Sequence, residues 1–225
     1  MSSTMQAWRT ALNVPSNQTY NAIKAVLDSI TGYWSSPSAD APPGNTDYYV
    51  SDNFFLRINS GGMAIYKGGV YGNSPISFGS YNNLTVYKSG DCVIICPSFE
   101  SSATSEYSAE AKYIIDKTGS GAGSTIIHTV SASDGYCKLF DNSNSAEMTV
   151  YSPYNGTYSL KPNTTFAQIA PFHNSALNKK CDTLYGVLLA PKMNEFVDIN
   201  GVKWLFTNGF AVSAGNEVPT PVIPS

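Results

Sequence analysis

The architecture of this chain follows most directly from residues 185–212, YGVLLAPKMNEFVDINGVKWLFTNGFAV. Within them, Asn200-Gly201 separates two apolar runs, the pattern that best predicts a two-residue β-hairpin turn. Both turn residues need a positive φ, which glycine adopts freely and asparagine tolerates. We therefore expect two antiparallel strands that meet at this turn.

A turn at Asn200-Gly201 also fixes the register of the two strands. The expected partners are Ile199 with Val202, Asp198 with Lys203, Val197 with Trp204, and Phe196 with Leu205. Side chains alternate along a strand, so an apolar set shares one face: Val197, Ile199, Val202, Trp204 and Phe206. We predict that this face is buried and that the Asp198–Lys203 pair lies on the opposite face. Turn signals at 207–209 and at Pro191 extend the pattern to a meander of antiparallel strands.

The composition limits the classes of function. Of the 225 residues only 13% are charged, whereas 12% are aromatic, including 15 tyrosines. A surface dominated by uncharged polar residues and tyrosine suits packing against other protein chains. The formal net charge of -3 and the scattered lysines and arginines argue against nucleic acid as a partner. Because no apolar run reaches the roughly 18 residues of a membrane-spanning helix, we expect no membrane partner.

The four cysteines are Cys92, Cys96, Cys137 and Cys181. The first residues, MSSTMQAWRT, have neither the basic start nor the apolar centre of a signal peptide, so we expect reduced thiols. A free cysteine is most often a small buried hydrophobic residue, and this is the interpretation we favour.

Two helices are expected near the N-terminus. Residues 3–13 place apolar side chains at helical spacing before Pro15. A second helix begins at an N-cap formed by Ser16 or Asn17 and stops at Gly32. The Pro- and Ser-rich segment that follows indicates a linker with a boundary near Pro43.

From Tyr48 onward, short β-favouring runs alternate with Gly, Asn, Ser and Pro. The run CVIIC at 92–96 is apolar throughout, which predicts a strand buried on both faces. The fold class is therefore mainly β, an antiparallel β-sandwich or barrel with a short N-terminal helical arm. The expected parts are an arm and linker at 1–43, a β domain at 44–214 and an extended Pro-rich tail at 215–225.

No catalytic or cofactor-binding group emerges from the sequence. The glycines of 119–123 have G-x-G-x-G spacing and precede a predicted strand, which favours a hairpin turn over a phosphate-binding loop. In a strand, Cys92 and Cys96 would lie too far apart for one metal ion, and His128 and His173 lack a nucleophile motif. Several carboxylates are available for hydrolysis: Asp52, Glu100, Glu106, Glu110, Asp134 and Glu147. Any β protein has as many, so we predict no enzymatic activity, no metal and no cofactor.

A set of tyrosines in or near predicted loops suggests an alternative. These residues, which are suited to stacking on sugar rings or to lying in a protein interface, are Tyr71, Tyr81, Tyr151, Tyr154 and Tyr158. They support a carbohydrate-binding or receptor-binding module as the alternative function, with a glycan as partner.

Taken over its full length, the chain resembles structural proteins of tailed-bacteriophage virions. It shares their low charge, their abundance of Tyr, Asn, Gly, Ser and Thr, and hairpins such as EFVDINGVKWLF at 195–206. The resemblance implies a capsid decoration, neck, tail or baseplate component that assembles symmetrically with copies of itself and other virion proteins. It also implies a place in the virion, after assembly in the host cytoplasm.

Overall fold

A computed structural model describes most of the chain, which divides into two compact units. The described residues are 4–35, 44–51, 54–67, 71–79, 81–98, 111–118, 125–131, 136–140, 148–151, 169–174, 179–187, 195–207 and 210–225. The first unit consists of Met1–Gln6, Tyr87–Cys96 and Ser108–Thr220, and the second of Ala7–Val86, Pro97–Tyr107 and Pro221–Ser225. Because residues 36–43 lie outside the described residues, the boundary expected near Pro43 and the three expected parts stay predictions.

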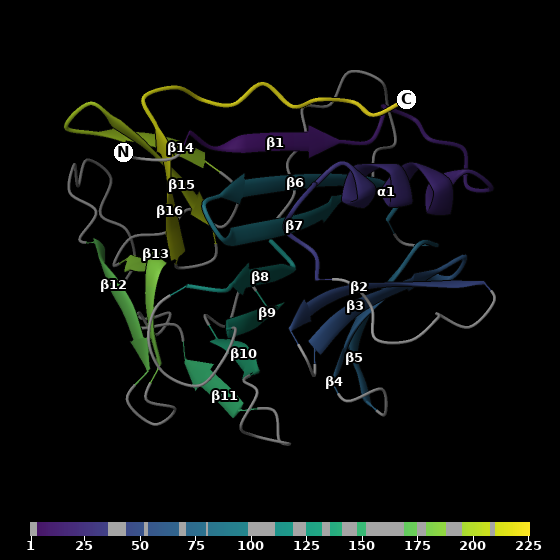
Figure 1. Cartoon of the computed structure of the whole chain (residues 1–225), viewed down its shortest axis with the longest axis horizontal. Helices are drawn as coiled ribbons and strands as arrows, with labels where there is room; N and C mark the ends of the chain where they lie inside the picture. The colour runs from purple at the N-terminus through teal and green to yellow at the C-terminus, as the bar shows by residue number, and fades with distance from the viewer. Residues whose placement is uncertain are drawn as a thin grey trace. The chain divides into compact units, whose positions relative to one another are not determined.

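The described part of the chain is mainly β, with antiparallel sheets and one short helix, as predicted (Figure 1). The seven-stranded sheet has the order β1 (Gln6–Arg9), β6 (Asn83–Ser89), β7 (Cys92–Ser98), β8 (Tyr113–Asp116), β9 (Thr125–Ser131), β10 (Tyr136–Phe140), β11 (Met148–Tyr151). The five-stranded sheet has the order β12 (Ile169–Asn174), β13 (Lys179–Val187), β16 (Phe210–Gly215), β15 (Val202–Thr207), β14 (Glu195–Ile199). The four-stranded sheet has the order β2 (Asn45–Ser51), β3 (Phe54–Asn59), β4 (Gly62–Lys67), β5 (Tyr71–Ser77). The helix is α1 (Thr19–Asp28).

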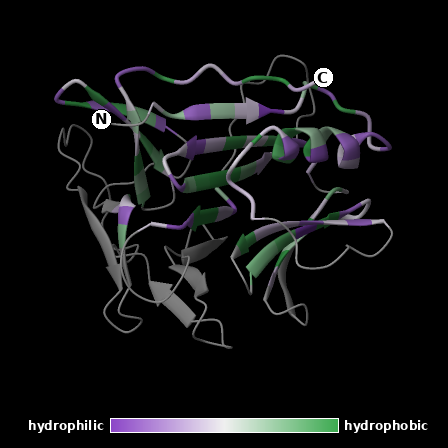
Figure 2. Ribbon diagram, viewed as in Figure 1, coloured by the Kyte–Doolittle hydropathy of each residue, from purple (hydrophilic) through white to green (hydrophobic). Residues whose placement is uncertain are grey.

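Two sheets enclose the core of the first unit. Its apolar cluster joins β7 and β8 to β13, β15 and β16, and its buried members are Met5, Cys92, Ile94, Cys96, Ala111, Ile114, Cys181, Leu184, Leu205, Phe210, Val212 and Ala214. Every residue of β7 is buried, and Figure 2 colours the strand almost continuously hydrophobic. The prediction of a strand buried on both faces is therefore confirmed, and the two sheets pack on each other through this apolar cluster, as in a sandwich.

The hairpin at Asn200-Gly201 has the predicted turn and register. Asn200 has φ 54° and Gly201 has φ 82°, and β14 pairs with β15 from Phe196 opposite Leu205 to Ile199 opposite Val202. Paired in the same way, β16 continues the meander on the other side of β15. The turn residues were therefore sufficient to predict the alignment of β14 with β15.

The predicted burial of this hairpin is wrong in one respect. The face opposite the predicted one carries Leu205, which is fully buried in the core of the first unit. On that same face the exposed Asp198–Lys203 pair lies next to the turn. The pair made the whole face look polar in sequence, although the strand is apolar farther from the turn. As a result, β15 carries large apolar side chains on both of its faces.

Within residues 3–13, which were predicted to form a helix, the structure has strand β1 (Gln6–Arg9). The Thr10 amide donates to the Leu84 carbonyl, and the Leu84 amide donates back to the Thr10 hydroxyl. On the other side, the Arg9 amide donates to the Val222 carbonyl. Pairing with distant segments thus satisfies this backbone and overrides a helical spacing too short to sustain a helix alone.

The second predicted helix is confirmed, with a different start. It begins at Thr19 after a turn in which the Gln18 amide donates to the Pro15 carbonyl, so neither Ser16 nor Asn17 caps it. Beyond its end, Gly32 has φ 73°, as expected of a glycine that stops a helix. Among the described residues no helix has the length and apolar character needed to cross a membrane.

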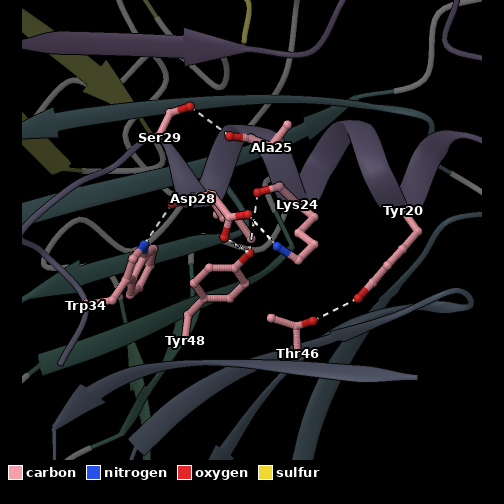
Figure 3. Close-up of polar contacts among 9 residues, drawn as sticks. Tyr20, Lys24, Ala25, Asp28, Ser29, Trp34, Thr46 and Tyr48 are labelled. Atoms are coloured by element: carbon pink, nitrogen blue, oxygen red, sulfur yellow. Dashed lines mark hydrogen bonds and ion pairs between the residues drawn. The ribbon is translucent and has the colours of Figure 1, made fainter. Parts of the chain in front are cut away.

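Polar contacts hold α1 on the four-stranded sheet (Figure 3). The Tyr48 hydroxyl of β2 donates to the Asp28 carboxylate at 2.7 Å, and the hydroxyls of Tyr20 and Thr46 are 2.8 Å apart. The Trp34 indole donates to the Leu27 carbonyl at 2.9 Å. Burial, with Asp28 adding to it, raises the pKa of Tyr48 far above its ordinary value. The helix is therefore part of the folded second unit.

Candidate functional site

The five-stranded sheet presents a second apolar face on the side away from the sandwich core. We call it the Trp204 face, and its members are the partly exposed Tyr185, Val197, Ile199 and Trp204 around the buried Phe206 and Ala211. Alternation explains the arrangement, because Leu205 points into the core and the residues on either side of it point the other way. All six members are uncharged.

A close aromatic pair is part of this face. The rings of Tyr185 and Trp204 are 5.1 Å apart and meet edge to face at 81°. They come from β13 and β15, which flank β16, and the residue of β16 opposite Tyr185 is the small Ala211. Because a methyl side chain leaves space above the strand, the two rings reach each other across it. Edge-to-face pairs contribute roughly 0.5–1.5 kcal/mol beyond their burial. The contact between the two rings therefore helps to hold both side chains in one orientation on this face.

The nearest ion pair keeps its charges off the Trp204 face. The Lys203 ammonium donates to the Asp198 carboxylate at 2.7 Å, and the Gly201 amide donates to the same carboxylate at 2.9 Å. The hydrogen bond from Lys203, followed by that from Gly201, lowers the pKa of Asp198. Both charged residues alternate with the apolar ones and therefore belong to the opposite face.

A second aromatic group lies on the four-stranded sheet, in the second unit. Tyr49, Phe55 and Tyr66 are cross-strand neighbours on β2, β3 and β4, with ring centroids 5.3 and 5.5 Å apart. The Arg57 guanidinium lies 5.3 Å from the Phe55 centroid and 4.8 Å from that of Tyr66. It also makes two hydrogen bonds to the Asp47 carboxylate, at 2.8 and 3.2 Å. We call Tyr49, Phe55 and Tyr66 the aromatic row; the Arg57 charge beside it is balanced by that of Asp47.

Two chemically reactive groups of the first unit, Asp116 and Cys92, are buried in its core. Asp116 is fully buried and accepts hydrogen bonds from the amide and the hydroxyl of Thr118. The Thr118 hydroxyl also lies 2.9 Å from that of Thr183, which links β8 to β13. Burial, together with Asp116 and Cys181, raises the pKa of the Cys92 thiol well above its usual range. A thiol held protonated in this way is a poor nucleophile and metal ligand.

The predicted cysteine burial is confirmed for Cys92, Cys96 and Cys181, which are free thiols. Within the described ranges no group of three or more His, Cys, Asp or Glu side chains is placed to hold a metal ion. His128 lies in β9 and His173 in β12.

The tyrosines predicted from loop positions are not gathered into one described site. Tyr81 is partly exposed, and its amide donates to the Ser77 carbonyl at 3.1 Å. Tyr71 is the first residue of β5 and Tyr151 the last of β11, while Tyr154 and Tyr158 lie outside the described residues. Their role in binding stays a prediction.

Sequence reasoning did not single out the aromatic residues on the sheet faces. Trp204 had been assigned to a buried face, and Tyr185 had only been quoted as part of its segment. The available signal was that Leu205 lies between Trp204 and Phe206, so that β15 carries large apolar side chains on both faces, which is unusual for an antiparallel strand with one solvated face. Tyr49, Phe55 and Tyr66 give a similar signal, because a period of two puts them on the same side of neighbouring strands.

In comparisons with protein-family models, curated proteins and solved structures, nothing matched this chain.

Proposed function

We propose that this chain is a non-catalytic structural subunit that assembles with copies of itself, as a capsid decoration, neck, tail or baseplate component of a virion. The observation that carries the proposal is the Trp204 face. A strand pair in a sandwich normally buries one face and solvates the other. Here the face that remains after the core is filled is apolar, aromatic and partly exposed.

The chemistry of the face favours a second copy of the chain as its occupant. Tryptophan and tyrosine are the residues that most often dominate interface energies, because a large rigid ring is buried at a small entropic cost. A two-fold axis places a surface patch against the same patch of its partner. Since the Trp204 face carries no charge, this contact brings no like charges together.

The edge of the same sheet favours packing of face on face. Among the described strands β14 lies at one edge of the sheet, and its Glu195 and Asp198 are exposed. Carboxylates along an edge oppose its pairing with the identical edge of another copy, because like charges would then be neighbours. We therefore expect copies to meet through the Trp204 face and not by extending the sheet.

The virion setting is supported by the sequence as a whole. Few charged residues and many Tyr, Asn, Gly, Ser and Thr residues make a surface that is easily desolvated against protein neighbours. The resemblance to structural proteins of tailed phages is of this general kind. The resemblance supports the virion of a tailed phage as the particle in which such a subunit functions.

A pair of variants on adjacent residues tests the proposal. Trp204→Ser removes the partly exposed indole of the face, whereas Lys203→Gln changes the neighbouring residue, which lies on the other face. We expect Trp204→Ser to weaken self-association at least about thirtyfold, because truncating a hot-spot residue costs about 2 kcal/mol or more. Lys203→Gln should leave it unchanged. Both are measured by sedimentation equilibrium, with near-ultraviolet circular dichroism to verify folding. Equal association of the two variants would contradict the proposal.

The aromatic row of the second unit favours carbohydrate binding as a second candidate function. Tyr49 and Tyr66 are partly exposed, and within the described part of the chain neither hydroxyl has a hydrogen-bond partner. Aromatic rings beside hydroxyl and guanidinium donors suit a neutral sugar, because the Arg57 charge is balanced by Asp47. A glycan array on the intact chain tests this function. Loss of a signal in Tyr66→Ala, but not in Tyr81→Ala, would place it on the sheet, and an array without any signal would exclude it.

A further inference from the structure

The C-terminal tail, Asn216–Ser225, is ordered although none of its residues is buried. It contains three of the most exposed large apolar residues of the described chain, Val218, Val222 and Ile223, at 50%, 57% and 47%. Pro221–Ser225 runs along β1 (Figure 1). The Val222 amide donates to the Ala7 carbonyl and the Arg9 amide donates to the Val222 carbonyl, both at 2.9 Å.

These contacts are few for a segment of this length. A backbone hydrogen bond adds roughly 1 kcal/mol net to stability, whereas fixing one residue costs roughly 1–2 kcal/mol of conformational entropy. Within the described part of the chain, two such bonds join the tail, which has ten residues including three prolines, to β1. The apolar side chains would add stabilisation if another surface covered them. Within the described part of the chain the tail is therefore joined to β1 by few hydrogen bonds, and about half of each of these apolar residues is exposed.

We propose that the tail is exchanged between copies, so that in the assembly Val222 pairs with strand β1 of a second copy. This inference depends on the proposed function, because it requires that copies associate. The pairing itself is the one seen within the chain, and only the molecule that supplies β1 changes. Because the hydrogen bonds lost within one copy are formed again with the other, the exchange costs little free energy. In the interface between the two copies, the exposed side chains of the tail become covered.

The connector to the tail suits exchange. The backbone of Gly215, at the end of β16, has φ 84°, and five residues separate it from Pro221. Five extended residues span about 17 Å, and the prolines favour an extended chain over a compact turn. Pro221 and Pro224 also lack amide donors, so pairing is confined to the residues around Val222. The exchange therefore has a single register and does not extend into an open-ended sheet.

A photo-crosslinking experiment on the full chain tests the exchange. Benzoylphenylalanine replaces Val222 in an unlabelled chain, which is refolded together with an equal amount of isotopically heavy, otherwise unmodified chain. Mass spectrometry then identifies whether the β1 peptide linked to residue 222 is light or heavy. Random exchange predicts that roughly half of these crosslinks join a light tail to a heavy β1. The same substitution at Ile223 repeats the test, and at Ser60, an exposed turn residue, it serves as the control.

The outcomes separate the exchange from the proposed function. Crosslinks to β1 that are light only, from both tail positions, in a sample that light scattering shows to be associated, would overturn the exchange and leave assembly standing. A sample that is monomeric at every concentration would overturn both. Light-to-heavy crosslinks from the tail positions, absent from the Ser60 control, would support the exchange.

Discussion

Gly201 shows how much depends on one residue of the β14–β15 hairpin. Its φ of 82° lies in the left-handed region, and no atom would obstruct an added Cβ there. Any cost of substitution is therefore conformational and not steric crowding by neighbours. Asn200, at φ 54°, holds the other turn position, which glycine adopts equally well.

We predict that Gly201→Ala lowers the free energy of unfolding by about 1–2 kcal/mol, because a side chain is strained at this φ. Asn200→Gly should change it by only a few tenths of a kcal/mol. Urea denaturation followed by tryptophan fluorescence gives both values. Equal destabilisation by the two substitutions would mean that the turn geometry is not the controlling factor.

Asp116 is the residue on which the buried polar network of the first unit depends. Asp116→Ala removes the acceptor for the Thr118 amide and hydroxyl, so we predict a loss of about 2–3 kcal/mol of stability. Asp116→Asn keeps an acceptor oxygen and should cost less. Asp91→Asn, at an exposed position nearby in the chain, is the control and should be close to neutral. A small effect of Asp116→Ala in thermal and urea unfolding would contradict the role assigned to the network.

The raised pKa of Cys92 predicts a loss of stability at alkaline pH. A thiol with a higher pKa in the folded than in the unfolded state stabilises the fold fully below its ordinary value of 9.0. As the pH rises above 9, the Cys92 thiol of the unfolded chain releases its proton while that of the folded chain keeps it. The unfolded state is thereby favoured, and the free energy of unfolding falls. Between pH 9 and 10.5, Cys92→Ala should therefore lose stability less steeply than the unmodified chain, by up to about 1.4 kcal/mol per pH unit. Identical slopes in urea denaturation would refute this.

At the scale of elements, α1 and the four-stranded sheet depend on each other. The helix buries Ile23, Val26 and Leu27 and contacts β3, while the Tyr48 hydroxyl joins its last turn to β2. Without a side-chain cap at its first residue, a helix of ten residues is marginal by itself. Its stability therefore comes from packing against the sheet.

We predict that Tyr48→Phe destabilises the second unit by about 1–2 kcal/mol, since it removes a hydrogen bond to a charged carboxylate in a partly buried place. Tyr20→Phe, which removes a bond between two hydroxyls, should cost less. Hydrogen exchange of the α1 amides measures both effects directly. Unchanged protection in Tyr48→Phe would show that packing alone holds the helix.

At the scale of the whole molecule, the features set by residues close in sequence were predictable, whereas those set by residues far apart in the chain were not. The Asn200-Gly201 turn, the register of β14 and β15, and the burial of β7 follow from neighbouring residues, and all are confirmed. The strand β1 was missed because its partners, Leu84 and Val222, are far away in the chain. For the same reason the Trp204 face required the structure, since its rings come from strands that are not consecutive.

The central claim is that this chain functions by associating with copies of itself, and light scattering of the unmodified protein across a concentration series tests it most directly. We predict a mass that rises from the 24.1 kDa of one chain to at least twice that value as concentration increases. A constant mass of one chain up to the highest soluble concentration would contradict the claim.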